Sequence, residues 1–484
     1  MSLARRSVTS AAWNSIASAA RLVVLFARYV VLARLLPVDT FGVYAGANAL
    51  VQLTVLVAAF GMGGAFLHRA PETKDEDQAA AVHLTLKLIF TLAWAGLMLI
   101  GTALFATGET RTALLLLTIT TAGTQLAQTP ELILIRRVVH RRLALLQLLN
   151  ALLTTLVAVG LAWGGATLWA LLATDVVTMI LTLAALYGWR PVWRPHLAWT
   201  PDVMRYFLHF GSRNFAAVTL LQALDKFDDL WTRFLLGTTA MGYYSRAYNF
   251  ATYPRTILAA PINTVSGGTY AELKEDRQRL SRAFFRTNAF LVRSGFFLAG
   301  LLALAAPEFI RLVLGDKWLP MLDAFRLMLV FTLLDPIKIT VSNLFIAVGK
   351  PEKVVRIRLI QLAVLLTGLF TLGPALGIAG VALAVDVMLV VGITLLLWQA
   401  RTDVEFSARR LFAVPMLALL LGLAAARAAI TIPGVLGSDW RTGAVKAVVF
   451  CLLYVGVMLL LERDQISMLL NIFGMLRPKD QPVN

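Results

Sequence analysis

The stretch RLLPVDTFGVYAGA at residues 34–47 has a counterpart 200 positions later, FLLGTTAMGYYSRA at residues 234–247. Five positions are identical: Leu35, Leu36, Gly42, Tyr44 and Ala47 recur as Leu235, Leu236, Gly242, Tyr244 and Ala247. Each stretch lies where one long hydrophobic segment meets the next, and Asn14 upstream recurs as Asn214. The pattern predicts an internal duplication. Two similar halves that move against each other about a central site are typical of membrane transporters.

The composition indicates a protein embedded in a membrane. Hydrophobic residues make up 59% of the chain and charged residues 15%, and the mean hydropathy is +0.76. A soluble protein of this length does not carry so much apolar surface. Apolar stretches of about 20 residues predict an all-α integral membrane protein with about 14 transmembrane helices. They lie near residues 11–36, 41–67, 82–106, 111–134, 143–164, 166–187, 206–236, 240–265, 283–305, 319–347, 357–377, 379–400, 412–432 and 443–461.

The basic residues predict the orientation of the chain. An even number of segments places both termini on one side, and Lys and Arg concentrate in the loops of that side. Examples are RRVVHRR at 136–142 and KEDRQRLSR at 274–282. By the positive-inside rule both termini are cytoplasmic. The first segment is long, carries three arginines and has no small-residue cleavage site, so we expect it to remain as a helix.

The spacing of the duplication predicts the domain organisation. Six segments fall within one repeat, and an even number preserves orientation, so we expect parallel repeats related by an axis along the membrane normal. The predicted parts are an N-terminal lobe at 1–187, a cytoplasmic interfacial linker at 188–205, a C-terminal lobe at 206–400, and two further helices with a cytoplasmic tail at 401–484. The two six-helix lobes would enclose a central cavity.

Two arginines mark one face of the first segment. Arg21 and Arg28 are seven residues apart, which places them within about 20° of each other around a helix. A charge at the bilayer centre costs roughly 2.5–3.5 kcal/mol on insertion scales, so it needs a reason. One alternative for Arg21 is that it reaches the cytoplasmic headgroups along the lipid.

The seventh segment is richer in charge and contains Arg213, Asp225, Asp228 and Asp229. The aspartates are spaced at i,i+3 and i,i+4, which predicts several carboxylates on one helical face. A face of this kind suits a hydrated cavity better than lipid. Two close carboxylates could bind and release a proton, and the alternative is a structural ion-pair network.

Further charged residues lie within other predicted segments. They are Lys87, Asp175, Arg255, Arg293, Asp335, Lys338 and Asp386. Snorkelling or pairing between helices explains each one singly. As a group, several arginines and lysines at membrane depth suit an anionic headgroup, because guanidinium groups bind phosphate oxygens in a bidentate manner.

Several functions are disfavoured. The net charge of +17 is dispersed over short loops, whereas nucleic-acid binding needs a contiguous basic patch. The five histidines, His68, His83, His140, His196 and His209, lack metal-ligand spacing, so we expect no metal. Cys451 stands alone, and no phosphate-binding GxxxxGK[ST] loop or other cofactor motif is present.

Three motifs resemble a known family. They are Asp228 with Gly237 and Gly242-Tyr243-Tyr244-Ser245-Arg246-Ala247-Tyr248-Asn249, then Gly315-Asp316-Lys317-Trp318 with Ala347-Val348-Gly349-Lys350-Pro351, and the stretch from Arg34 to Tyr44. They are similar to motifs of bacterial polysaccharide flippases of the colanic-acid and teichuronic-acid exporter type. These flippases belong to the multidrug, oligosaccharidyl-lipid and polysaccharide export superfamily. The resemblance covers about residues 10–460, and it departs at Arg233 and Phe234, where that family often has glycine and arginine.

The resemblance implies a transporter of the bacterial cytoplasmic membrane rather than an enzyme. Its members move undecaprenyl-diphosphate-linked oligosaccharides from the cytoplasmic to the periplasmic leaflet. We expect Arg21, Arg28, Arg213, Arg255 and Lys338 to receive the diphosphate or acidic sugars, and Asp225, Asp228 and Asp229 to be candidates for ion coupling. The expected partners are the lipid-linked glycan and membrane lipids, with a glycan polymerase and export machinery as candidates.

Three other classes of protein are alternatives. A cation-coupled multidrug exporter of the same superfamily predicts an acidic or aromatic cavity and usually twelve spans. A membrane enzyme such as a glycan polymerase, ligase or glycosyltransferase needs a long extracytoplasmic loop or a cytoplasmic domain with acid–base or metal residues, and the sequence shows neither. A scaffold would leave the charges within the segments without a purpose.

Overall fold

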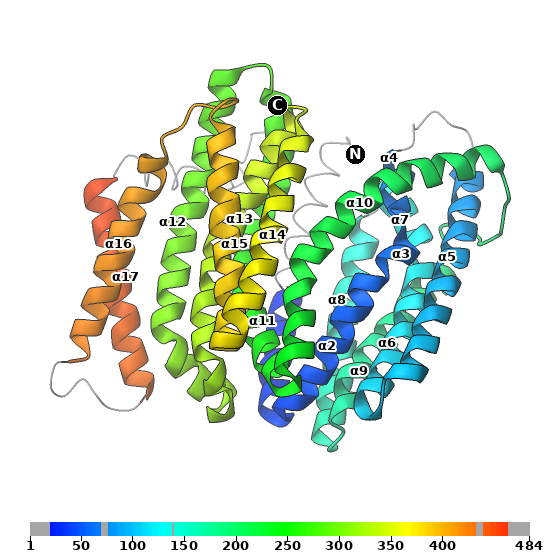
Figure 1. Ribbon diagram of the computed structural model, residues 1–484, viewed down its shortest axis with the longest axis horizontal. Helices are drawn as coiled ribbons and strands as arrows, with labels where there is room; N and C mark the ends of the chain where they lie inside the picture. The colour runs from blue at the N-terminus through cyan, green and yellow to red at the C-terminus, as the bar shows by residue number, and fades with distance from the viewer. Residues whose placement is uncertain (1–19, 69–75, 138–139, 432–438, 463–484) are drawn as a thin grey trace, which may run out of the picture. The chain divides into compact units, whose positions relative to one another are not determined.

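The chain is helical throughout its described part. The computed structural model describes residues 20–68, 76–137, 140–431 and 439–462, and these residues contain helices and turns without a strand (Figure 1). The predicted all-α membrane fold is confirmed. Contacts divide the chain into two compact units, Met1–Ser245 and Arg246–Asn484, and each is described by itself.

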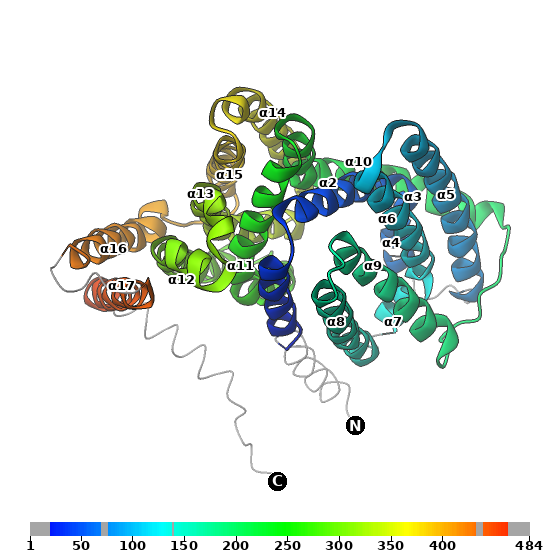
Figure 2. The same ribbon diagram turned by 90° about the horizontal axis from the view of Figure 1, so that it is seen from below.

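The first unit starts with a helix at residues 20–35. It continues with α2 (Val38–Thr54), α3 (Leu56–Ala59), α4 (Met62–His68), α5 (Glu76–Phe105), α6 (Gly108–Leu126), α7 (Gln128–Arg136), α8 (His140–Trp163), α9 (Leu168–Leu183) and α10 (Pro201–Trp231). Short π-helical turns extend α9 as η1 (Ala184–Gly188) and α10 as η2 (Thr232–Leu236). The start of α11 (Thr238–Leu273) completes this unit. The helices α8 and α9 lie side by side in both views (Figures 1 and 2).

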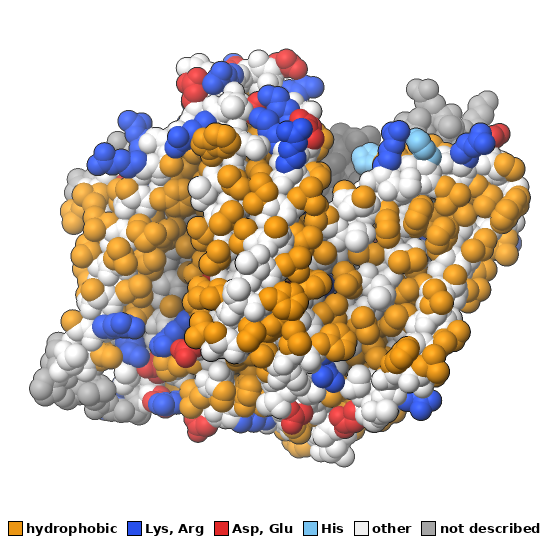
Figure 3. Space-filling model, viewed as in Figure 1, with side chains coloured by type: hydrophobic (Ala, Val, Ile, Leu, Met, Phe, Trp, Pro, Cys, Tyr) orange, Lys and Arg blue, Asp and Glu red, His pale blue; other side chains and the backbone are white. Residues whose placement is uncertain are grey.

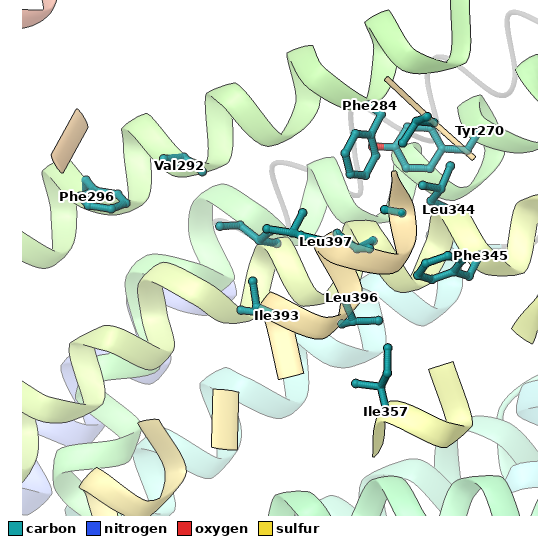
Figure 4. Packing of buried hydrophobic residues seen from close by; sticks show 14 of the residues in the cluster. Tyr270, Phe284, Val292, Phe296, Leu344, Phe345, Ile357, Ile393, Leu396 and Leu397 are labelled. Carbon is teal, nitrogen blue, oxygen red and sulfur yellow. The ribbon is translucent and has the colours of Figure 1, made fainter. Parts of the chain in front are cut away.

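The second unit holds the rest of α11 and the helices that follow. They are α12 (Arg277–Phe309), η3 (Ile310–Leu314), η4 (Asp316–Met321), α13 (Leu322–Ala347), α14 (Pro351–Leu376), α15 (Ile378–Ala400), α16 (Ala408–Ala429) and α17 (Asp439–Leu461). Aromatic and branched side chains, among them Phe284, Phe345 and Ile393, form its core (Figure 4). Helices α16 and α17 pack on α12, where Gly300 and Gly422 leave room for the ring of Phe450.

Ten helices within the described residues are long and apolar enough to cross a membrane. They coincide with ten of the fourteen predicted spans, and the other four predictions fall on the helix at 20–35, α6 with α7, α10 and α11. Large apolar side chains face outward along these helices, including Leu97 at 71% and Phe105 at 88% exposure. Figure 3 shows hydrophobic side chains along the helix sides and Lys and Arg near the helix ends. Such surfaces are stable in lipid and not in water.

The span predicted at 41–67 is not one continuous helix. It is broken into α2, α3 and α4, with a left-handed backbone at Phe60 (φ 42°) and Gly61 (φ 63°). A Cβ atom at Gly211 of α10 would lie 2.5 Å from the Phe60 carbonyl oxygen, so the two backbones approach closely here. Asn214 donates a hydrogen bond to the Gly61 carbonyl oxygen (3.3 Å). The duplicated asparagine thus satisfies a backbone group freed by the break, and its counterpart Asn14 lies outside the described residues.

Helix α10 belongs by its contacts to the first unit, because it packs on α2, α4 and α5. The contact boundary therefore follows Ser245, whereas the sequence places the lobe boundary at the linker 188–205. The lobes as defined by the duplication stay a prediction.

The two copies of the duplicated stretch contact each other within the first unit. A Cβ atom at Gly42 would overlap the carbonyl oxygen of Thr238, and one at Gly242 would overlap that of Val38. The Thr239 hydroxyl donates a hydrogen bond to Asp39. The first two contacts are the same contact with the two copies exchanged, and Asp39 and Thr239 are equivalent positions, as a local pseudo-twofold axis requires. The two copies of the duplicated stretch therefore pack against each other through a symmetric backbone contact.

This contact predicts the effect of enlarging either glycine. We expect Gly242→Ala to lower the free energy of unfolding by about 1–3 kcal/mol, because an added methyl group must displace backbone rather than a mobile side chain. The measurement is the Tm of purified protein in detergent. The matched control is Gly96→Ala, since nothing lies within 4 Å of a Cβ there. Equal Tm values for Gly242→Ala and wild type would contradict the close approach.

Candidate functional site

The arginine face of the first helix lies against α8. Arg21 Nη1 donates to Gln147 Oε1 (3.1 Å), and Arg28 Nη1 donates to Thr154 Oγ1 (2.9 Å). The two residues of each pair are 126 positions apart in the sequence. A step of seven residues along the first helix therefore matches a step of seven residues in the same direction along α8, so the two helices run parallel. Both partners are neutral acceptors, an amide and a hydroxyl. These hydrogen bonds orient the guanidinium groups. Neither arginine forms a salt bridge among the described residues, although the Asp175 carboxylate interacts electrostatically with Arg28.

A polar cluster continues from Arg28 toward α2 and α9. The Tyr44 hydroxyl donates to Asp175 Oδ2 (2.9 Å), and the Thr178 hydroxyl donates to Asn150 Oδ1 (3.1 Å). The Arg28 guanidinium lies 5.3 Å from the ring centre of Tyr29, within the range of a cation–π contact. We call the set Arg21, Arg28, Tyr44, Gln147, Thr154 and Asp175 the N-terminal cluster. It places Asp175, a lone acid in the sequence, as the acceptor of a motif tyrosine.

The second motif tyrosine also donates to a carboxylate, but to one on α10 instead of α9. Tyr244 is fully buried, and its hydroxyl donates to Asp228 Oδ2 (2.5 Å). Asp228 is 4% exposed, and its other oxygen has no hydrogen-bond partner among the described residues. Tyr44 and Tyr244 therefore each hold a membrane-depth carboxylate, one in each copy of the motif.

The other two aspartates of α10 are placed differently. Asp229 is buried and pairs with Lys226 (3.1 Å), which agrees with the alternative of a structural ion pair. Asp225 is exposed. The three carboxylates therefore do not share one environment. Arg213 on the same helix is also exposed.

Arg255 and Lys338 are brought together in the second unit. Arg255 of α11 and Lys338 of α13 both pair with Asp335, the lysine at 2.5 Å. Asp335 is 3% exposed, while the two cations are about one quarter exposed. Both cations also lie over the Phe331 ring, at 5.0 Å and 5.9 Å from its centre. We call Arg255, Asp335 and Lys338 the triad. It carries a net charge of +1, and its two cationic side chains are partly exposed while its carboxylate is buried.

The first cluster and the triad belong to different units. The sequence expectation that Arg21, Arg28, Arg213, Arg255 and Lys338 line one central cavity stays a prediction.

Other family-motif residues have structural roles. Gly237 has φ +92°, a conformation that L side chains rarely adopt, and it ends the π-helical turn after α10. Trp318 is fully buried, and Lys317 lies exposed 6.0 Å from its ring centre. Lys350 of the AVGKP segment pairs with Asp403, as does Lys353 (3.0 Å).

Two buried ion pairs involve acids that the sequence analysis did not single out. Glu462 forms a bidentate pair with Arg293 (2.7 and 2.8 Å), and Glu308 pairs with Lys446 (2.5 Å). Both pairs join α12 to α17 or the residue after it. The Glu462 carboxylate compensates the charge of Arg293, so this arginine is structural. No sequence spacing could have matched partners 169 and 138 positions apart.

Lys87 and Asp386 also belong to the charged residues that the sequence analysis placed within predicted segments. Lys87 is fully buried and donates to Gln125 Oε1 (2.6 Å). Asp386 on α15 is 5% exposed, and neither of its oxygens has a hydrogen-bond partner in the described part of the chain.

Together these features define a multipass helical membrane protein with oriented charges inside its spans. Residues 31–323 match the family described as polysaccharide biosynthesis protein. The chain belongs to this family, and the resemblance seen in its motifs is confirmed.

Named relatives agree with this assignment. The succinoglycan biosynthesis transport protein ExoT of Rhizobium meliloti is 26% identical over 327 residues, covering 63% of this chain and 62% of that protein. The lipopolysaccharide biosynthesis protein WzxC of Escherichia coli is 24% identical over 215 residues, 44% of each chain. The matched stretches thus span less than two thirds of either relative.

Solved structures agree at the level of the fold. The lipid II flippase MurJ in an inward closed conformation superimposes with a TM-score of 0.75 at 16% identity, covering 94% of this chain and 99% of that one. An inward-facing multidrug transporter of the MATE family gives a TM-score of 0.60 at 17% identity, covering 79% and 94%. The fold is that of these transporters.

The Asp403 ion pairs predict a pH dependence of stability. Burial acts to raise the pKa of Asp403, but the hydrogen bonds from Lys350 and Lys353 outweigh it and hold that pKa below its usual value. A carboxylate with a lowered pKa stabilises the fold above its unfolded-state pKa and loses this contribution as pH falls through the folded value.

We therefore expect Asp403→Asn to lower stability at pH 7 by on the order of 1 kcal/mol, since the lysines are partly solvated. The Tm difference from wild type should shrink as pH is lowered below about 4. Glu352→Gln is the control, because Glu352 is exposed and lies at the start of α14, between Lys350 and Lys353. A Tm difference that stays constant with pH would assign the effect to packing instead.

Proposed function

We propose that the protein moves a polyprenyl-diphosphate-linked oligosaccharide from the cytoplasmic to the outer leaflet of the bacterial cytoplasmic membrane. The observation that carries this proposal is the pairing of Arg21 and Arg28 with neutral acceptors on α8. A structural arginine within a membrane is compensated by a carboxylate, as Arg293 is by Glu462. Two oriented guanidinium groups that form no salt bridge in the described part of the chain are instead suited to an anion that arrives from outside the protein.

The charge of the substrate fits this arrangement. A diphosphate presents several oxygens to two guanidinium groups two helical turns apart. Hydrogen bonds to Gln147 and Thr154 hold these groups in place, so less side-chain entropy is lost on binding. In the expected orientation, with both termini cytoplasmic, an inside-negative potential favours outward movement by about 2.3 kcal/mol per charge per 100 mV.

The family and its relatives support the same reading. ExoT and WzxC are named for transport or biosynthesis of surface polysaccharides, and MurJ is named a lipid II flippase. The multidrug exporter alternative has support at the level of the fold alone, and the two arginines on the first helix do not favour a cationic drug. Glycan polymerase and export machinery remain proposed partners.

The substrate site is tested with Arg28→Gln. We expect at least a tenfold loss of flipping, because a bidentate charged contact is replaced by a neutral one. The readout is the distribution of lipid-linked oligosaccharide between leaflets in a deletion strain that expresses each variant. Arg356→Gln, which removes an exposed arginine of α14, is the control. Full flipping by Arg28→Gln at normal abundance would show that Arg28 does not bind the diphosphate. If lipid-linked oligosaccharide does not accumulate in the cytoplasmic leaflet of the deletion strain, the proposed function is wrong.

Asp228 is the proposed coupling carboxylate. One of its oxygens binds Tyr244 and the other has no partner in the described residues, so it can take a proton or a sodium ion. We expect Asp228→Asn to remove the response of flipping to an imposed ion gradient while the response to membrane potential persists. Asp225→Asn is the control, since Asp225 is exposed. An unchanged gradient response in Asp228→Asn would exclude this carboxylate from coupling.

A further inference from the structure

A basic pocket lies in the second unit, apart from the clusters described above. It has a volume of about 640 Å³ and lies where the first turns of α12 and α16 meet the loop before α16. Its lining residues include Arg277, Arg282, Phe285, Arg286, Phe406 and Arg410. The volume is within the range of small-ligand sites, about 300–1,000 Å³.

The pocket carries an excess of positive charge. Its one lining acid, Glu405, pairs with Arg277 (3.6 Å). Arg282, Arg286 and Arg410 are exposed and form no ion pair with a carboxylate among the described residues. Arg282 and Arg286 are spaced i,i+4 on α12, where like charges repel and destabilise the helix. A bound anion would relieve this repulsion.

The walls of the pocket are fixed by specific contacts. Ser281 donates to the Arg277 carbonyl oxygen (2.7 Å) and accepts from the Glu405 backbone N–H (2.9 Å), which ties the loop to α12. The rings of Phe406 and the buried Phe284 lie 5.3 Å apart. Asp403, two residues before Glu405, is held by Lys350 and Lys353. The arginines therefore surround a preformed hollow rather than a mobile loop.

The position of the pocket indicates an amphipathic ligand. The sequence predicts apolar spans at 283–305 and 412–432, and the pocket arginines lie before these spans or in the first turn of one, at the expected level of the lipid headgroups. Phe285 and Phe406 add an apolar wall. Below the pocket α16 exposes Met416, Leu417 and Leu420, by 42%, 45% and 57%. Basic pockets between helices at this level bind phosphate-bearing lipid headgroups.

We propose that this pocket binds the phosphate group of an anionic phospholipid, with the acyl chains along α16. Arg282, Arg286 and Arg410 would contact the phosphate oxygens, and Phe406 would cover the glycerol. The inference does not depend on which substrate the protein moves.

The test compares two double variants of the full-length protein. Arg282→Gln/Arg286→Gln removes two pocket charges, and Arg356→Gln/Arg401→Gln removes two exposed arginines of the same unit that do not line the pocket. Each protein is placed in phosphatidylethanolamine nanodiscs, and phosphatidylglycerol or inorganic pyrophosphate is titrated in separate arms. Native mass spectrometry then counts bound ligand.

We expect phosphatidylglycerol affinity to fall about 25-fold in the pocket variant, about fivefold for each arginine, and less than twofold in the control. All four substitutions are at exposed positions, so the Tm of both variants should match wild type. If pyrophosphate and not phosphatidylglycerol shows arginine-dependent binding, the occupant is a soluble phosphate compound and the lipid assignment is overturned. Equal affinities of the two variants for both ligands would overturn the site itself.

Discussion

The close backbone contact between the two copies of the duplicated stretch is the constraint on which the rest of the first unit depends. Gly42 and Gly242 each sit where a Cβ atom would meet the carbonyl oxygen of the other copy. This contact fixes the start of α2 against the start of α11. It also sets the positions of Tyr44 and Tyr244 one half-turn further along each helix, and so determines which carboxylates they reach. The symmetry does not extend to the acceptors, because Tyr44 donates to Asp175 of α9 and Tyr244 donates to Asp228 of α10, whose equivalent in the first copy is Arg28.

Compensation separates the structural charges in the spans from the functional candidates. Removing a charge from water is costly unless an opposite charge and hydrogen bonds replace the solvent. Arg293 with Glu462 and Lys446 with Glu308 meet this condition, and they join α17 and the residue after it to α12. Arg21 and Arg28 are oriented by an amide and a hydroxyl instead. Arg28 also lies within electrostatic reach of Asp175, but neither arginine forms a salt bridge among the described residues, so both stay candidates for binding an anionic ligand.

The triad of Arg255, Asp335 and Lys338 is intermediate between these cases. One buried carboxylate serves two cations, and both cations are partly exposed over the Phe331 ring. Neither cation would be stable at this depth without Asp335. The net positive charge stays on the two cations, which the face of the Phe331 ring attracts electrostatically.

The sequence by itself determined the fold class, because a backbone in lipid must satisfy its own hydrogen bonds and long apolar segments can do so only as helices. It also determined the duplication, the family and the arginine face of the first helix, since these depend on local spacing and composition. Only the tertiary structure decided which charges are paired. Arg293 and Arg28 look alike in sequence, yet one meets a carboxylate 169 residues away and the other a threonine. The break at Phe60 and Gly61 likewise required the approach of α10. Partners brought together by packing over such separations leave no periodic signal along the chain.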